Sequence, residues 1–181
     1  MAKFKKKDSQ AVPNEITPSP DLPAATIDGI EVEIVPPDMG LIQELAKMVK
    51  PTDKKAMMVF NYSDPEQALI YALGRGDILF VGKINKKIVC ALAIIPKTNI
   101  KDKGASIWLI CTPTADEFPV TFLKRSKQYI DKIADKYDYL DTIIDEEVPV
   151  NVKYAEFMGF KATDEVFAII NDRFRYFKRD K

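Results

Sequence analysis

The stretch from residue 106 to residue 160 constrains the fold more than any other part of the chain. Residues 106–112 are a short apolar run rich in β-forming residues, which predicts a buried strand. The pattern then predicts a helix that ends near Lys136, a second strand over 139–144, and a second helix over 150–158 that stops at Gly159. Two strands joined by a helix in this way lie parallel, with a right-handed crossover. The sequence therefore predicts an α/β domain built around one parallel pair of strands.

Further strands and helices are expected on both sides of this unit. Residues 30–35 alternate for most of their length and predict a half-buried strand that ends at Pro36. Residues 77–83 and 87–96 flank a short turn, which is the spacing of a β-hairpin. Helices are expected after Asp38, over about 54–60 and after Pro65, and short strands over 160–162, 166–170 and 173–178. The predicted fold is a mixed α/β sheet of about six or seven strands with flanking helices, as a single domain over residues 29–181.

Residues 1–28 differ in composition from this domain and predict a disordered or extended arm. Four lysines lie within the first seven residues, and four prolines follow by residue 23. Such a segment has too little apolar surface to offset the entropy lost on ordering. It is either a solvated tail or an arm that docks on a partner, in which case its apolar anchors are Phe4, Val12, Ile16 and Leu22.

Composition excludes several classes of function. Lysine plus arginine and aspartate plus glutamate are balanced at 27 each, so the net charge gives no reason to expect nucleic acid or membrane as a partner. No apolar run approaches the roughly 20 residues of a membrane span. The absence of histidine removes the commonest general base and metal ligand, so no metal site is expected. Cys90 and Cys111 lie in apolar strand patterns and are interpreted as buried, reduced thiols of a cytoplasmic protein.

The last strand allows two interpretations. Residues 173–179 mix basic and aromatic side chains, which could contact nucleic acid. A basic edge strand that resists aggregation is the commoner use of this pattern, and it is the interpretation we favour.

The order of the predicted elements resembles the GNAT acetyltransferase fold over residues 30–178. The run Glu156-Phe157-Met158-Gly159-Phe160 is similar to the terminal signature of that family. The resemblance implies acetyl-CoA as the cofactor, bound where the strand over 106–112 passes into the next helix. The implied cofactor-binding residues are Cys111, Thr112, Thr114 and Ala115.

A narrower resemblance is to the GNAT-like internal virion proteins of short-tailed bacteriophages. The similar pieces, in order, are Trp108–Thr112, Phe118-Pro119, Phe122–Ser126, Tyr137, Leu140 and Gly159-Phe160. This resemblance implies a role in virion structure or morphogenesis, with phage structural or assembly proteins as partners. It also implies a location in the host cytoplasm and in the virion.

The loop over residues 112–119 argues against a bound pyrophosphate. GNAT enzymes hold the pyrophosphate on a glycine-rich loop, but this loop has no glycine, and Pro113 and Pro119 each lack an N–H. Asp116 and Glu117 add negative charge, and Thr114-x-x-Glu117 predicts a capping box that uses the free donors of the helix start. A chain without bound cofactor is therefore favoured over one that holds acetyl-CoA.

The candidate catalytic residues are Tyr154 and Asp145. GNAT enzymes often use a tyrosine four residues before the glycine, where this chain has Ala155; Tyr154 lies about 100° round the helix and is expected to point elsewhere. The family's usual asparagine is replaced by Val148. Asp145 belongs to an acidic group with Asp141, Glu146 and Glu147, and could accept a proton from an amine, although acids before a helix commonly serve its dipole.

Two functions remain open on the sequence. The first is a catalytically degenerate GNAT-fold protein of a phage particle. The alternative is an active acetyl-CoA-dependent N-acetyltransferase that acts on an unknown amine.

Overall fold

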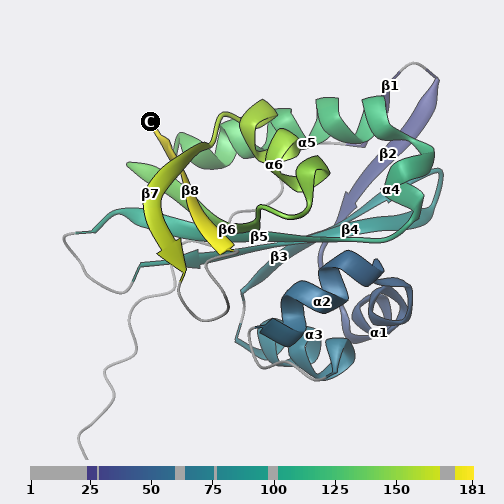
Figure 1. Cartoon of the computed structure of the whole chain (residues 1–181). Helices are drawn as coiled ribbons and strands as arrows, with labels where there is room; N and C mark the ends of the chain where they lie inside the picture. Colours follow the sequence, from purple (N-terminus) through teal and green to yellow (C-terminus); the bar gives the residue numbers. More distant parts are fainter. Residues whose placement is uncertain (1–23, 28, 60–63, 76, 98–101, 168–173) are drawn as a thin grey trace, which may run out of the picture.

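The computed structural model describes residues 24–27, 29–59, 64–75, 77–97, 102–167 and 174–181. Within these residues eight strands form one mixed sheet in the order β1-β2-β3-β4-β5-β6-β8-β7 (Figure 1). Only β5 and β6 pair in parallel; every other neighbouring pair in the described sheet is antiparallel. The strands are β1 (Ala25–Ile27), β2 (Ile30–Val35), β3 (Ile78–Ile84), β4 (Lys87–Pro96), β5 (Gly104–Cys111), β6 (Tyr139–Asp145), β7 (Lys161–Phe167) and β8 (Phe174–Asp180). The predicted mixed α/β fold is confirmed.

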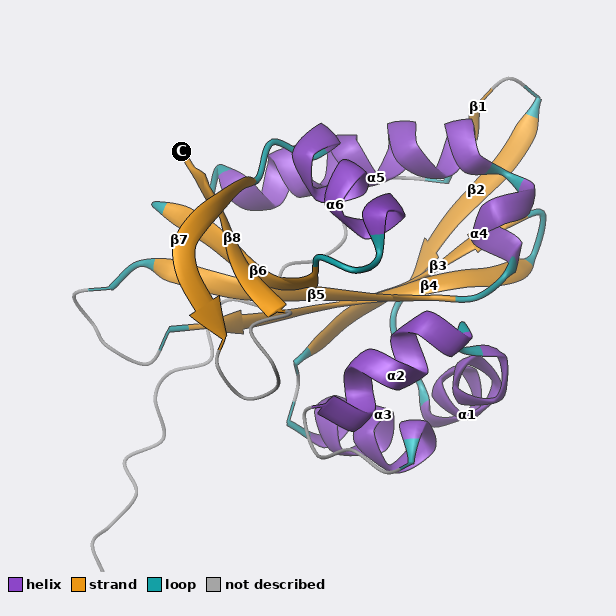
Figure 2. Cartoon of the chain, viewed as in Figure 1, coloured by secondary structure: helices purple, strands orange, loops and turns teal. Residues whose placement is uncertain are grey.

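Helices cover both faces of the sheet (Figure 2). On one face lie α1 (Met39–Met48), α2 (Pro51–Val59) and α3 (Pro65–Gly74), which pack on β3, β4 and β5. On the other face α5 (Pro119–Ala134) and α6 (Pro149–Phe157) enclose the larger core, and the short α4 (Thr114–Glu117) lies against β4. No helix of the described residues is both long and apolar enough to cross a membrane.

Local sequence signals explain where these elements begin and turn. The Asp38 side chain accepts a hydrogen bond from Leu41 N at 2.8 Å and caps α1, and Asp64 caps α3 through Glu66 N at 2.9 Å. The β3–β4 hairpin turns at Asn85 and Lys86, whose φ angles are +47° and +66°. Two consecutive positive φ angles are typical of the type I′ turn, which matches the twist of the two strands. The predicted hairpin is confirmed.

The parallel β5–β6 unit is held by α5. Tyr129, Ile130 and Ile133 of α5 are buried against the sheet, and the Tyr129 ring packs edge-on to Phe80 with centroids 4.2 Å apart. Burying a side chain of this size contributes about 1.5–3 kcal/mol. This packing makes α5 the crossover that sets β5 and β6 side by side.

Both ends of the predicted pattern change in the structure. Strand β1 pairs with β2 through Ala25↔Val32, so the sheet begins upstream of residue 29, where the sequence pattern placed the start of the domain. Strand β7 runs over Lys161–Phe167 and joins the expected edge at 160–162 to the start of the apolar run at 166–170. Strand β8 lies between β6 and β7, so the edge-strand interpretation favoured for residues 173–179 is wrong, and β7 is the edge of the described sheet. Residues 1–23 of the expected arm, and 168–173, lie outside the described residues.

Candidate functional site

Strands β5 and β6 separate along their length, and this separation defines the candidate site. Their parallel pairing consists of Gly104↔Tyr139, Ala105↔Leu140 and Ser106↔Asp141. Beyond these residues β5 continues to Cys111, while β6 stays paired with β8 up to Asp145. The C-terminal half of β5 therefore has a ladder on its β4 side and an unpaired edge on its β6 side.

Residues at the junction between α1 and α2 form hydrogen bonds with the backbone at the end of this unpaired edge. The backbone N–H of Cys111 donates to Asp53 Oδ2 at 2.7 Å, and the backbone N–H of Lys50 donates to Cys111 O at 3.0 Å. Burial raises the pKa of the Asp53 carboxyl, and the hydrogen bond from Cys111 partly offsets this rise. Asp53 was not singled out from the sequence, because only its place at the start of a helix is visible there.

The backbone of Leu109 faces the same gap. Successive residues of a strand turn their backbone N–H and C=O groups to alternate sides. Because both groups of Cys111 point away from β4, those of Leu109, two positions earlier, point that way as well.

The loop after β5 is held by its own hydrogen bonds. Thr112 is fully buried; its N–H donates to Val89 O at 2.8 Å and its hydroxyl to Ile88 O at 2.7 Å. The N–H groups of Ala115 and Asp116 donate to Thr112 O and Pro113 O. Pro113 occupies the N-cap position of α4 without a side-chain cap, so the capping box predicted for Thr114 and Glu117 is wrong. A proline at the cap has no side-chain acceptor for the free donors of the helix.

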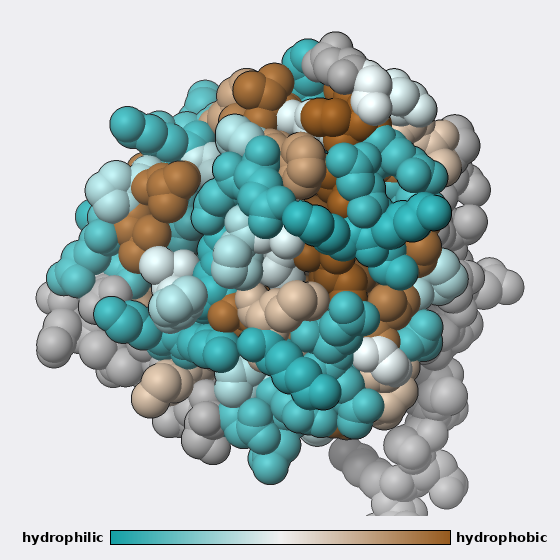
Figure 3. Space-filling view, turned by 90° about the vertical axis from the view of Figure 1, so that its right-hand side faces the viewer, coloured by the Kyte–Doolittle hydropathy of each residue, from teal (hydrophilic) through white to brown (hydrophobic). Residues whose placement is uncertain are grey.

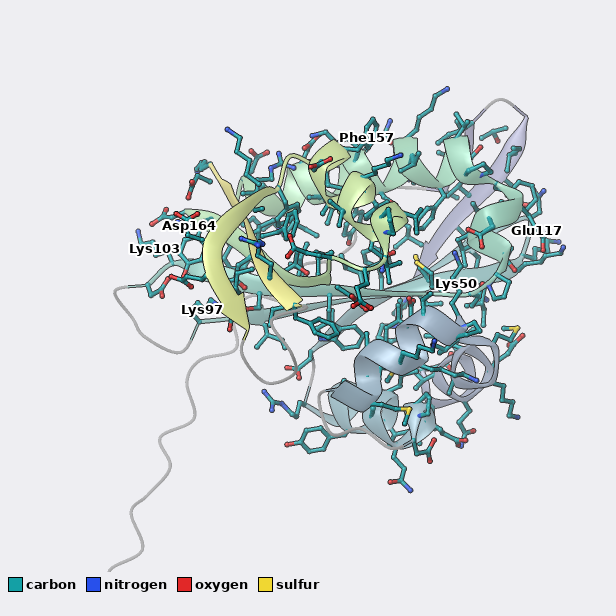
Figure 4. The ribbon with its side chains drawn as sticks, viewed as in Figure 1. Lys50, Lys97, Lys103, Glu117, Phe157 and Asp164 are labelled. Carbon is teal, nitrogen blue, oxygen red and sulfur yellow. The ribbon has the colours of Figure 1, made fainter. Side chains whose placement is uncertain are left out.

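The acidic side chains of α4 are paired with lysines from other elements. Lys50 Nζ lies 2.7 Å from Asp116 Oδ1, and Lys87 Nζ lies 2.9 Å from Glu117 Oε2. Figure 4 places Lys50 and Glu117 at the same end of the sheet. Both carboxylates remain substantially exposed, and an approaching anion would have to compete with them for the ammonium groups of Lys50 and Lys87.

Tyr154 of α6 points toward the sheet. Its ring stacks on Phe122 with centroids 5.7 Å apart, and its hydroxyl is hydrogen-bonded to the Ser126 side chain. Burial raises the pKa of the Tyr154 hydroxyl well above its usual range. Ala155, at the family's tyrosine position, is buried in the core instead.

A cavity lies between α5 and the sheet, and Tyr154 forms part of its wall. About 490 Å³ within it is free of protein atoms, part of this being open solvent. Its walls are mainly apolar and include Ile34, Phe80, Leu92, Leu109, Phe122 and Tyr154. Figure 3, viewed from the α4 end, shows hydrophobic residues reaching the surface between hydrophilic ones.

Asp145 lies apart from Tyr154. Its carboxylate is buried and accepts a hydrogen bond from Glu147 N at 3.0 Å, while its carbonyl accepts from Val148 N at 3.1 Å. Strand alternation places Asp145 on the face opposite Leu140 and Ile144, which belong to the α5 side. The two candidate catalytic residues are therefore not brought together, and Asp145 holds the turn before α6.

A polar cluster of Lys97, Ser106 and Asp141 occupies the start of the separation. Ser106 Oγ donates to Asp141 Oδ1 at 2.5 Å, and Lys97 Nζ lies 2.8 Å from Ser106 Oγ and 2.5 Å from Asp141 Oδ2. The three groups satisfy one another and join β5 and β6 to the end of β4. Only the β5–β6 register could have revealed this cluster, and the sequence pattern does not fix that register.

Comparison with known proteins finds likeness only among solved structures. No family model and no curated protein matches the chain. The GNAT domain of S. lividans PAT superposes with a TM-score of 0.63 at 13% identity, covering 90% of this chain and 99% of that one. The fold is that of the GNAT acetyltransferases.

Two further GNAT-like neighbours were solved with acetyl-CoA. A putative acetyltransferase from Salmonella typhimurium has a TM-score of 0.56 at 8% identity, covering 82% of this chain and 93% of that one. The microcin C7 self-immunity acetyltransferase, solved with acetyl-CoA and AMP, has a TM-score of 0.57 at 13% identity, covering 86% and 94%. At these identities the likeness shows the fold alone.

The residues at the GNAT cofactor position do not fit a pyrophosphate. Thr112 and Ala115 are buried, and the backbone of Cys111 is bonded to Asp53 and Lys50. Thr114 and Cys111 are the partly exposed residues of the four. Donors at a helix start attract phosphate when they are free. Here the N–H groups of Ala115 and Asp116 are already bonded within the loop, and the lysines near the loop are paired with the α4 carboxylates.

Proposed function

We propose that this GNAT-fold chain is catalytically degenerate and acts in the structure or morphogenesis of a bacteriophage particle. The proposal of catalytic degeneracy rests on one observation: the backbone of Cys111, at the unpaired edge of β5, is hydrogen-bonded to Asp53 and Lys50. The phage part rests on the motif resemblance over residues 108–126 and at Gly159-Phe160. The expected partners are phage structural or assembly proteins, met in the host cytoplasm and retained in the virion.

The hydrogen bond between Cys111 N–H and Asp53 occupies a donor that a ligand at this strand edge would need. An extended ligand with amide groups could pair with a free strand edge, as an added strand does. Here the Cys111 N–H already donates to a carboxylate, and such charge-assisted bonds are stronger than those between neutral groups. Displacing Asp53 would leave a partly buried carboxylate without this donor, which is unfavourable.

The charge of α4 opposes the phosphates of a cofactor. Asp116 and Glu117 lie in the turn that would face a pyrophosphate, and their partners Lys50 and Lys87 are already engaged by them. A phosphate would therefore compete with carboxylates for the same ammonium groups.

The assembly role is tested in infected cells. A tagged chain should co-purify with particles at a fixed stoichiometry, and deletion of its gene should lower the yield of complete particles. Absence from purified particles, together with normal particle yield after deletion, would rule the assembly role out.

A second candidate function is an acetyl-CoA-dependent N-acetyltransferase. Its supporting observation is the hydroxyl of Tyr154 at the wall of an apolar cavity, with Leu109 in the same wall. Acetyl transfer to a panel of amines would separate the two functions. Turnover that is lost in Tyr154→Phe, which keeps the ring and removes the hydroxyl, would favour the enzyme.

A further inference from the structure

The two cysteines of the chain lie directly opposite each other in the β4–β5 ladder. The register pairs Cys90 with Cys111, and cross-strand partners project from the same face of a sheet. Cys90 is buried in the core under α5, and Cys111 is partly buried beside it. Both are free thiols in this structure.

The backbone bonds identify the kind of pair. In an antiparallel ladder, opposed residues either exchange two hydrogen bonds or exchange none. Cys111 directs its N–H to Asp53 and its carbonyl to Lys50, so it exchanges none with Cys90. Non-hydrogen-bonded partners have Cα atoms about 4.5 Å apart, with closely approaching side chains. A disulfide accepts Cα separations of about 4.4–6.8 Å, and the spacing typical of such pairs lies within this range.

We propose that Cys90 and Cys111 form an intramolecular cross-strand disulfide when the folded chain meets a peroxide. The thiolate of Cys111 attacks one oxygen of hydrogen peroxide and becomes a sulfenic acid, with release of one water after protonation. The thiolate of Cys90 then attacks the sulfenic sulfur, the S–S bond forms, and the hydroxyl leaves as a second water. Two thiols are oxidised by two electrons, and one peroxide is reduced to two waters.

Exposure sets the order of these steps. Cys111 is the less buried of the two residues, so it meets the oxidant first, and Cys90 resolves the intermediate from the core side. Burial raises the pKa of Cys90 to about 12 and that of Cys111 well above its ordinary value. The thiolate reacts and the thiol does not, so closure is slow near neutral pH and accelerates roughly tenfold per pH unit below these pKa values.

The test uses the full chain, hydrogen peroxide and a thiol-blocking quench. Trypsin cleaves after Lys97 and Lys103, so the two cysteines fall on separate peptides, 88–97 and 104–124. We expect these peptides to be joined, at a mass lower by two hydrogen atoms than their sum, and to separate again with dithiothreitol. The oxidised monomer should also melt at a higher temperature than the reduced one, because the link restricts the unfolded chain.

Single variants provide the matched controls. Cys90→Ser and Cys111→Ser should each lose the joined peptides, and Cys90→Ser should accumulate sulfenic acid at Cys111. If either variant fails to fold, the peptide map of the unaltered chain still decides the question. The proposal is overturned if the product is a disulfide-linked dimer or two independently overoxidised cysteines. It is also overturned if raising the pH does not accelerate closure, or if the folded thiols stay unreacted during prolonged exposure to peroxide at alkaline pH.

Discussion

The carboxylate of Asp53 accepts a hydrogen bond from the backbone N–H of Cys111 at 2.7 Å, across 58 positions of sequence. Together with the bond from Lys50 N to Cys111 O, this contact joins the start of α2 to the end of β5. The α1–α2 junction thereby takes the place that a further strand or an extended ligand would take at this edge. The proposal of a degenerate GNAT protein depends on this contact.

Replacing Asp53 should destabilise the fold, and the loss should be smaller if the new side chain can still accept a hydrogen bond from Cys111 N–H. Asp53→Ala leaves the Cys111 N–H without its partner, and an unsatisfied buried donor costs about 1–3 kcal/mol. Asp53→Asn keeps one acceptor oxygen and should cost less. Urea unfolding measures both free energies, with exposed Asp164→Ala as a control expected within about 0.5 kcal/mol of the unaltered chain. Equal stability of the alanine and control variants would show that the bond to Cys111 contributes nothing.

Asp131 should make stability depend on acid pH. Burial tends to raise the pKa of Asp131, but hydrogen bonds from Lys127 and Arg179 outweigh it and hold the pKa below its ordinary value. A lowered pKa stabilises the fold above the pKa of the unfolded chain, about 4, and this contribution is lost as the pH falls through the folded value. Asp131→Asn should therefore cost up to about 1 kcal/mol at pH 7, since the side chain is 44% exposed. Urea unfolding at several pH values should show the two chains converging in acid; a constant difference would refute this assignment.

Gly104 should not tolerate a side chain, because the Tyr139 ring lies over it. A Cβ at Gly104 would come within 2.6 Å of three Tyr139 ring carbons. Overpacking of this kind typically costs about 1–3 kcal/mol, so Gly104→Ala should lower the melting temperature. Gly74→Ala is the matched control, as nothing lies within 4 Å of the position that a Cβ would take there. The double variant Gly104→Ala with Tyr139→Ala should lose most of the Gly104→Ala penalty, and a fully additive result would contradict the clash.

Strand β1 should contribute to the stability of the domain. Two truncations that begin at residue 24 and at residue 29 differ by β1 and its short turn, and only the second exposes the β2 edge. The shorter chain should melt a few degrees lower, since about 1 kcal/mol shifts the melting temperature by about 2–4 °C at this size. Identical melting curves would mean that the β1–β2 pairing adds no stability.

Local sequence patterns correctly predicted several structural elements that are determined by residues close together in the sequence. The cap at Asp38, the hairpin turn at Asn85 and the parallel pair around α5 all follow from short-range signals, and all are present. The capping box at Thr114 failed because Pro113 takes the cap position and has no side-chain acceptor. Strand β1 was missed because three residues are too few for an alternating pattern.

The candidate site was less predictable, because its contacts join residues far apart in sequence. The bond from Cys111 to Asp53 and the cluster of Lys97, Ser106 and Asp141 depend on how helices and strands pack. The direction of the Tyr154 side chain depends on how α6 is rotated about its axis where it packs on α5. The position of a single residue on the helix does not determine this rotation. The sequence pattern predicted a strand at Cys111 and a helix at Tyr154, and both are present, but it left their contact partners open.

Calorimetric titration of the full chain with acetyl-CoA tests the degenerate cofactor site most directly. We expect no saturable heat up to millimolar cofactor, because Asp53 is bonded to the β5 edge and the α4 carboxylates compete with the phosphates for Lys50 and Lys87. Thr114 is the position for the specificity control, since Ala115 is buried and a large side chain there would disturb the core. Saturable binding in the micromolar range that is lost in Thr114→Trp would contradict the account and establish a working acetyl-CoA site.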